Sequence, residues 1–266
     1  MDLTCEERPS HSPLVAAVWR NQTEQPGSFI SIAQPLWEMV VTRHNGTTTL
    51  TVRGPETRAT RAYAPADAEF FGILFKPGAF MPTLPARMVM DRRDLNLPEA
   101  GDKSFWLNGR AWKFPDYENA DTFVDWLARD GLLVHDPVVD AAAQGQPVDT
   151  SSRTVQRRFL QATGLTQTAL YQIERARYAT SLLKQGVSIL DTVFQAGYFD
   201  QPHLTRSLKH YVGQTPAQIA DQNRTERLSL LYKTSTPLLN YDVEVRQFST
   251  DRRGASYEPG SYRLYP

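Results

Sequence analysis

The chain contains little cysteine and little histidine, and these shortages exclude several kinds of site. Its 266 residues include one cysteine, Cys5, so an intrachain disulfide framework and a cysteine-based zinc cluster are excluded. The sequence shows no obvious general base for the Cys5 thiol, and we expect a loose N-terminal segment there rather than a nucleophile. Of the five histidines, His11 and His44 lie in the first 120 residues, without a second histidine close to either. We therefore expect no catalytic residue, no metal and no cofactor.

Long hydrophobic runs are also missing. No segment approaches the roughly 18 apolar residues that a membrane-spanning helix needs. Residues 1–7 lack the basic and apolar parts of a secretory leader. We therefore expect a cytoplasmic protein that does not use the membrane as a partner. With 41% hydrophobic and 22% charged residues, the composition is typical of globular proteins rather than disordered chains.

Net charge is zero over the whole chain, but the charges are unevenly distributed. Residues 1–150 carry 14 basic and 20 acidic residues, whereas residues 151–227 carry 10 and 5. A basic segment therefore follows an acidic one, which favours a polyanion as the partner of the second segment.

Residues 1–118 read as β-rich. The β-branched runs 37–42 and 47–52 flank Asn45-Gly46, a dipeptide typical of a two-residue hairpin turn. Residues 58–63 and 69–75 are further strand candidates, and frequent prolines argue against long helices in this region.

From residue 119 onward the pattern becomes helical. Apolar spacing predicts helices over 121–127, 138–143, 151–162, 168–185, 189–196 and 201–211, and a last short helix from Pro216. Asp136, Thr150 or Ser151, Ser188 and Asp200 are the expected N-caps, and Asp191 is the expected capping-box partner of Ser188.

Residues 188–211 have the layout of a helix-turn-helix, with Gly197 opening the turn. The expected core consists of apolar residues, namely Val193, Ala196, Tyr198, Leu204 and Leu208. The opposite face of the second helix carries side chains suited to reading base edges in the major groove, namely Gln201, Thr205, Arg206 and Lys209. A helical hairpin with an ordinary solvated face would show the same pattern.

A second candidate unit lies at Ser151–Phe159. Val155 and Phe159 are its expected buried residues, and Arg153, Gln156 and Arg157 fall on the exposed arc. The helix between the two units spans about 27 Å at 1.5 Å per residue. This length suits two recognition helices set about 34 Å apart, one turn of the DNA duplex.

Three motifs together resemble the DNA-binding domain of AraC-type transcriptional regulators. They are Ser-x-Arg-Thr-Val-Gln-Arg-Arg-Phe at 151–159, Ala-Gly-Tyr-Phe-Asp-Gln-Pro-His-Leu-Thr-Arg at 196–206 and Gly-x-Thr-Pro at 213–216. The resemblance covers residues 136–220. It implies an α+β chain in which a β-rich domain precedes an all-α domain with two helix-turn-helix units joined by a long helix.

The resemblance also implies a function, that of a sequence-specific regulator which reads two successive major grooves and is not an enzyme. Arg153 and Arg157, and then Gln201, Thr205 and Arg206, would face the grooves. The implied partner is double-stranded promoter DNA. A small-molecule effector, a homodimer and, for an activator, RNA polymerase are left open.

The chain departs from the family pattern in three places, of which the first is Leu208, where the family more usually has phenylalanine. Residues 144–149 make a longer connection than the family's usual tight turn, and about 50 residues follow the Thr-Pro motif. We expect a regulatory domain at 1–118, a DNA-binding domain at 119–227 and an extension at 228–266, in which 241–246 alternates like a strand.

Two alternatives stay open for the first domain. A cupin-like small-molecule enzyme with an accessory helical part would also be β-rich, although it would need clustered histidine and carboxylate ligands. Large aromatic side chains either line an effector pocket or fill the core, namely Trp19, Trp37, Tyr63, Phe70 and Phe75.

Overall fold

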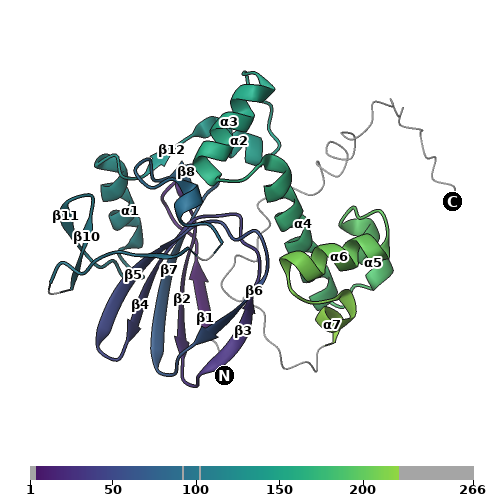
Figure 1. The fold of residues 1–266 in the computed structure, drawn as a ribbon, viewed down its shortest axis with the longest axis horizontal. Coiled ribbons are helices and arrows are strands. Elements are labelled where there is room, and N and C mark those ends of the chain that lie inside the picture. Colours follow the sequence, from purple (N-terminus) through teal and green to yellow (C-terminus); the bar gives the residue numbers. More distant parts are fainter. Residues whose placement is uncertain (1–3, 92, 102, 222–266) are drawn as a thin grey trace.

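The computed structural model describes residues 4–91, 93–101 and 103–221. Its β-rich first part lies beside a helical second part, as Figure 1 shows. The main sheet is antiparallel and has the strand order β1-β2-β7-β4-β5-β9. The bounds are β1 Thr4–Arg8, β2 Val15–Thr23, β7 Ala68–Phe75, β4 Glu38–His44, β5 Thr47–Arg53 and β9 Leu95–Asn96. The expected fold class is confirmed.

Three smaller ladders accompany this sheet. They pair β3 (Gly27–Ser31) with β6 (Thr60–Ala64), β8 (Ala79–Phe80) with β12 (Val134–His135), and β10 (Ser104–Leu107) with β11 (Arg110–Lys113). A 3-10 turn, η1 (Ala86–Met88), lies between β8 and β9.

The β4–β5 hairpin forms where Asn45-Gly46 predicts it. Asn45 and Gly46 have φ values of 50° and 77°, the left-handed backbone that this turn requires. The expected strands near 58–63 and 69–75 are also present, as β6 and β7. The expectation of a loose segment around Cys5 is wrong, because Cys5 lies in β1 and is aligned with Asn21 of β2.

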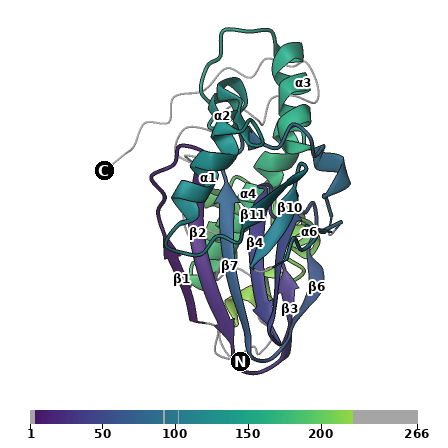
Figure 2. The same ribbon diagram turned by 90° about the vertical axis from the view of Figure 1, so that its left-hand side faces the viewer.

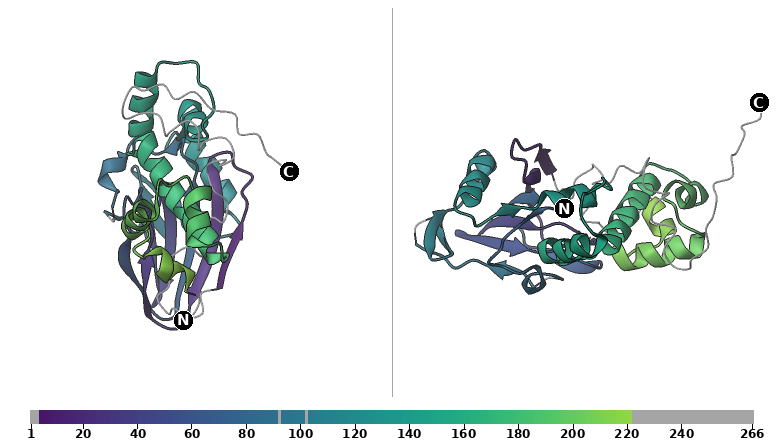
Figure 3. Two further views of the ribbon diagram at one scale, coloured as in Figure 1. Left: turned by 90° about the vertical axis from the view of Figure 1, so that its right-hand side faces the viewer. Right: turned by 90° about the horizontal axis from the view of Figure 1, so that it is seen from above.

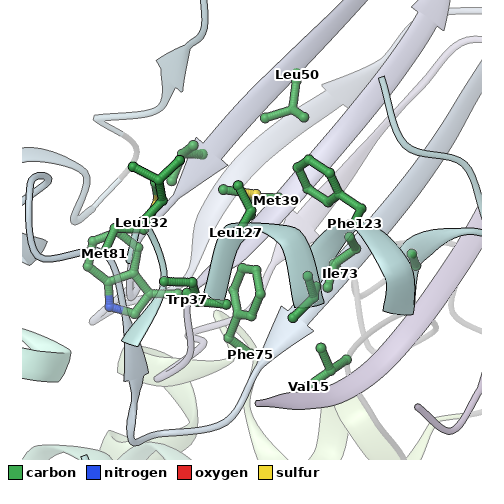
Figure 4. Packing of buried hydrophobic residues seen from close by; sticks show 14 of the residues in the cluster. Val15, Trp37, Met39, Leu50, Ile73, Phe75, Met81, Phe123, Leu127 and Leu132 are labelled. Atoms are coloured by element: carbon green, nitrogen blue, oxygen red, sulfur yellow. The ribbon is translucent and has the colours of Figure 1, made fainter. Parts of the chain in front are cut away.

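One face of the main sheet carries the larger hydrophobic core. Helix α1 (Ala120–Arg129) lies across that face and buries Phe123 and Leu127 against Met39 and Ile73 of the sheet, as Figure 4 shows. The expected domain boundary at 118/119 thus falls just before a helix whose buried side chains belong to the core of the β-rich part.

The remaining helices begin and end close to where their caps predict. They are α2 Pro137–Ala143, α3 Ser152–Thr163, α4 Gln167–Lys184, α5 Ile189–Gln195, α6 Gln201–Tyr211 and α7 Pro216–Ala220. The side chains of Asp136, Ser151, Ser188 and Asp200 each accept a backbone N–H bond at a helix start.

The expected capping box at Ser188 is replaced by a different contact. The Ser188 hydroxyl donates to the Asp191 carboxylate at 2.6 Å, so the carboxylate binds the capping side chain. The reciprocal capping box occurs instead at α7, where Thr215 and Gln218 bind each other's backbone N–H groups. The strand expected at 241–246 and the extension at 228–266 lie outside the described residues.

The helical layer packs on the side of the sheet away from α1, and the two views in Figure 3 show it there. Ile30 and Ile32, from β3 and the residue after it, belong to the same hydrophobic cluster as residues of α4 and α6. The backbone N–H groups of Ala33 and Ala59 donate to the carbonyls of Tyr211 and His210, at 2.8 and 2.9 Å. Strand-side residues therefore bind the last turn of α6 directly.

Gly72, in the central strand β7, allows the Trp19 indole to lie directly on the sheet. A methyl group added at Gly72 would overlap the Trp19 ring, which is 4% exposed. We predict that Gly72→Ala lowers the free energy of unfolding by about 1–3 kcal/mol, measured by chemical denaturation, because the core cannot expand. In the Gly72→Ala background, Trp19→Leu should restore part of the loss. Additive effects of the two substitutions would contradict this account.

Candidate nucleic-acid interface

Helices α5 and α6 form the second helix-turn-helix unit. The turn between them includes Gly197 at φ 66°, a conformation that costs other residues strain. Three apolar side chains from the two helices, Val193, Leu204 and Leu208, are buried between them. The core expected from the sequence is confirmed, including Ala196 and Tyr198 in the turn.

Arg175 of α4 holds the turn in place. Its guanidinium donates to the Gly197 carbonyl at 3.3 Å and lies 4.3 Å from the centre of the Tyr198 ring. The Tyr198 hydroxyl is in turn 2.9 Å from the Ser207 hydroxyl in α6. A buried arginine thus links the long helix, the turn and the second helix, a contact that the sequence analysis did not identify.

The free face of α6 carries the polar residues expected there. Gln201, Arg206 and Lys209 are exposed, and Thr205 is half-buried. His203 packs edge-on against the Tyr198 ring, with the ring centres 5.2 Å apart. Burial lowers the pKa of His203, and the charges of Arg175 and Arg206 lower it further. These effects favour the neutral form of the imidazole.

The first unit comprises α2 and α3. Val155 and Phe159 of α3 pack with Val139 of α2 and Leu170 of α4. Eight residues, 144–151, connect the two helices, in keeping with the long connection that the sequence predicts. Arg153, Gln156 and Arg157 are exposed on α3, on the side away from this core.

Asp136 and Arg158 fix α3 to the start of α2. The Arg158 guanidinium donates two hydrogen bonds of 2.7 Å to the Asp136 carboxylate. Burial acts to raise the pKa of Asp136, but the bonds from Arg158 and from the backbone of α2 hold it below its usual value. Arg158 is therefore engaged within the protein, whereas its neighbour Arg157 is free to meet a ligand.

Helix α4 lies between the two units and contacts both. Its 18 residues correspond to about 27 Å of helix. Apolar residues at helical spacing, such as Ile173, Ala176 and Leu183, are buried, but so are the charged residues Glu174 and Arg177. These two residues form an ion pair of 3.2 Å, and Arg177 also donates to Gln34 of the first part at 3.4 Å.

The aromatic residues considered for an effector pocket serve different purposes. Trp19, Trp37 and Phe75 are buried, and the Trp37 indole donates to the Ala162 carbonyl of α3 at 3.1 Å. Tyr63 is 65% exposed, and Phe70 is the one member of the set that lines the cavity considered below.

Two further kinds of feature are absent from residues 4–91, 93–101 and 103–221. Within those ranges no helix has the length and apolarity needed to cross a bilayer. The same residues hold no group of three or more histidine, cysteine, aspartate or glutamate side chains placed to bind a metal ion.

Comparison with known proteins identifies the helical part. The family model described as a helix-turn-helix domain matches residues 146–222, from the α2–α3 connection to just beyond α7. This match begins after α2, later than the resemblance at 136–220 suggests. No curated protein and no solved structure matches the chain.

Gly197 offers a test of the turn geometry. We predict that Gly197→Val lowers the free energy of unfolding by about 1–3 kcal/mol, because a β-branched residue is strained at φ 66°. Gly197→Asn should cost less, since asparagine tolerates the left-handed region. Chemical denaturation of both variants measures the difference, and equal stability of the valine variant and the wild type would contradict the turn as described.

Proposed function

We propose that this chain is a DNA-binding transcriptional regulator, because its residues 146–222 match a helix-turn-helix domain of the AraC type. From this premise we propose that it reads two successive major grooves with α3 and α6, and that its β-rich part modulates the reading. The observation that carries the proposal is the exposure of polar and cationic side chains on both helices, at Arg153, Arg157 and Arg206 among others.

Each helix supplies residues suited to base reading. Arginine binds guanine with two hydrogen bonds, and glutamine binds adenine in the same way. Both helices carry these two residue types, namely Arg153, Gln156 and Arg157 on α3, and Gln201 and Arg206 on α6. Thr205 adds a hydroxyl and a methyl group for a neighbouring base. Lys209, further along α6, is placed for a phosphate. Contacts of this kind weaken as the salt concentration rises.

The spacing of the two units supports reading on one face of the duplex. Helix α4, which connects the two units, is about 27 Å long, and successive major grooves lie about 34 Å apart. The β-rich part binds both units, through Trp37 and Ala162 at the end of α3 and through Ala33 and Tyr211 at the end of α6. Both recognition helices therefore rest on one scaffold.

These contacts support modulation by the first domain. A change in strand β3 or β6 would reach the last turn of α6 through the Ala33 and Ala59 hydrogen bonds. We propose that residues 1–118, together with α1 whose buried side chains belong to the same core, form the regulatory domain, and that the rest of 119–227 forms the DNA-binding domain, with a small-molecule effector as the input. A second copy of the chain and RNA polymerase stay as proposed partners. Regulators of this type are typically non-enzymatic, and we assign no reaction to this chain.

Selection of bound duplexes from a random library tests the proposal. We expect the recovered site to contain two conserved blocks whose centres lie one helical turn apart. Binding of that site should weaken with rising salt. A single conserved block, or no preference over scrambled duplex at moderate salt, would overturn the reading with two helices.

Arg206 is the residue on α6 with the clearest expected effect. We predict that Arg206→Ala weakens binding of the selected site by about 1–3 kcal/mol and relaxes one base position in one block. Arg129→Ala is the matched control, since Arg129 is an exposed arginine on α1, outside the helix-turn-helix units. A repeat selection with each variant measures this, and an unchanged site for Arg206→Ala would contradict its role.

Ile30 tests the coupling between the two parts. Its side chain is 6% exposed and packs in the cluster with α4 and α6. We predict that Ile30→Glu weakens binding of the selected site by about 1–3 kcal/mol, because α6 loses part of its support on the strand. Ser28→Glu, at an exposed position of the same strand, should leave the affinity unchanged. Fluorescence anisotropy titrations compare them, and equal affinities would argue against modulation through this contact.

A further inference from the structure

A cavity of about 470 Å³ lies on the sheet face that also carries α1. Figure 2 looks onto this face, where α1 lies across one end of the strands and the strands continue beyond it. The floor comes from β2, β4 and β7, and residues 116–118, just before α1, form a wall. Its volume is in the range of cavities that bind small molecules.

Negative charge predominates in this cavity. Five carboxylates and two guanidiniums line it. The two arginines are already compensated, since Arg20 pairs with Glu6 at 2.6 Å and Arg43 with Glu69 at 3.4 Å. Three carboxylates are left, from Glu24, Asp116 and Glu118, and among these Asp116 accepts backbone bonds at the start of α1.

The carboxylates of Glu24 and Glu118 have no hydrogen-bond or ion-pair partner among the described residues. Both side chains are exposed at the cavity, where a ligand can reach them. The charge of Arg20 already acts on Glu118, and a positively charged occupant would add to this attraction, whereas an anion would be repelled by the surplus of carboxylates.

The rest of the lining is apolar and aromatic. Val41 and Phe71 are buried in the sheet beneath the cavity, and Phe70 lies beside them. The Tyr117 ring in the wall already receives a cation, since the Arg20 guanidinium lies 4.4 Å from the ring centre. A cation held between an aromatic ring and carboxylates is therefore an arrangement that this wall accommodates within the protein itself.

We propose that this cavity binds a small organic cation with an apolar or aromatic body. The positive group faces Glu24 and Glu118, and the apolar body lies on Val41 and Phe71. A neutral or anionic molecule of the same shape gains the apolar contacts but lacks the charge interaction, so charge is the main determinant of selectivity.

The position of the cavity gives its occupant access to the helical part. Glu6 lines the cavity, and the next residue of β1, Glu7, points to the opposite side of the sheet by strand alternation. Helix α4 and the helices around it pack on that side of the sheet, as Figure 3 shows. A regulatory role for the occupant, as distinct from its binding, rests on the function proposed above.

Calorimetric titration of the full-length protein with ions of opposite charge tests the proposal. The probes are tetraphenylphosphonium, its anionic counterpart tetraphenylborate, and the smaller cation benzyltrimethylammonium. We expect saturable binding of at least one cation, and at least tenfold weaker binding of tetraphenylborate. Binding of the cation should also weaken as salt is added, because the carboxylates are exposed.

Variants locate the binding site. The double variant Glu24→Gln/Glu118→Gln should weaken cation binding by about fivefold to tenfold, and its exposed positions should leave thermal unfolding unchanged. Glu99→Gln is the matched control, because Glu99 is exposed and lies outside the cavity lining. Absence of binding for both cations, equal binding of the anion, or full affinity in the double variant would each overturn the proposal.

The same protein samples are titrated with the selected duplex. Duplex binding without cation binding would overturn the cavity proposal and leave the proposed function intact. Cation binding without duplex binding would support the cavity proposal and contradict the proposed DNA-binding function.

Discussion

The helical part depends on the burial of α4 from two directions. Eleven of its 18 residues are buried, because the two helix-turn-helix units pack on one side and the residues after β3 pack on the other. Arg175 uses this position to bind the turn before α6, and Leu170 contributes to the core beneath α3. A single helix therefore sets the positions of α3 and α6, so a displacement of α4 would move them together.

Local signals in the sequence predict most of the helical part. An N-cap side chain and a glycine stop act within a few residues, so Ser151 and Gly164 define α3 whatever packs around it. The Asn45-Gly46 turn is local in the same sense. Strands β2 and β3 escaped prediction because each pairs with a strand distant in the chain, β7 for β2 and β6 for β3.

Local sequence signals likewise predict one part of the candidate site and not the other. The exposed residues of α3 and α6 follow from helical periodicity, since Val155 and Leu204 identify the buried side and leave Arg157 and Arg206 on the other. Helical periodicity does not predict the second buried side of α4, because charged residues such as Glu174 are usually exposed to solvent. It does not predict the cavity either, because Arg20, Val41 and Tyr117 come together only when the sheet and the segment before α1 have assembled.

The composition of the contact between the two parts bears on whether they can separate. Ile30 and Ile32 bury apolar surface against α4 and α6, which favours the docked arrangement. The buried charges do not oppose separation strongly, because Arg177 pairs with Glu174 on its own helix and the pair stays intact when the surfaces part. The groups exchanged with water then include the Gln34 contact, the Trp37 indole bond to Ala162 and several backbone hydrogen bonds, each with a small net free energy. A contact of this kind can be shifted by a ligand of ordinary affinity, which is what modulation of a DNA-binding domain by its neighbour requires.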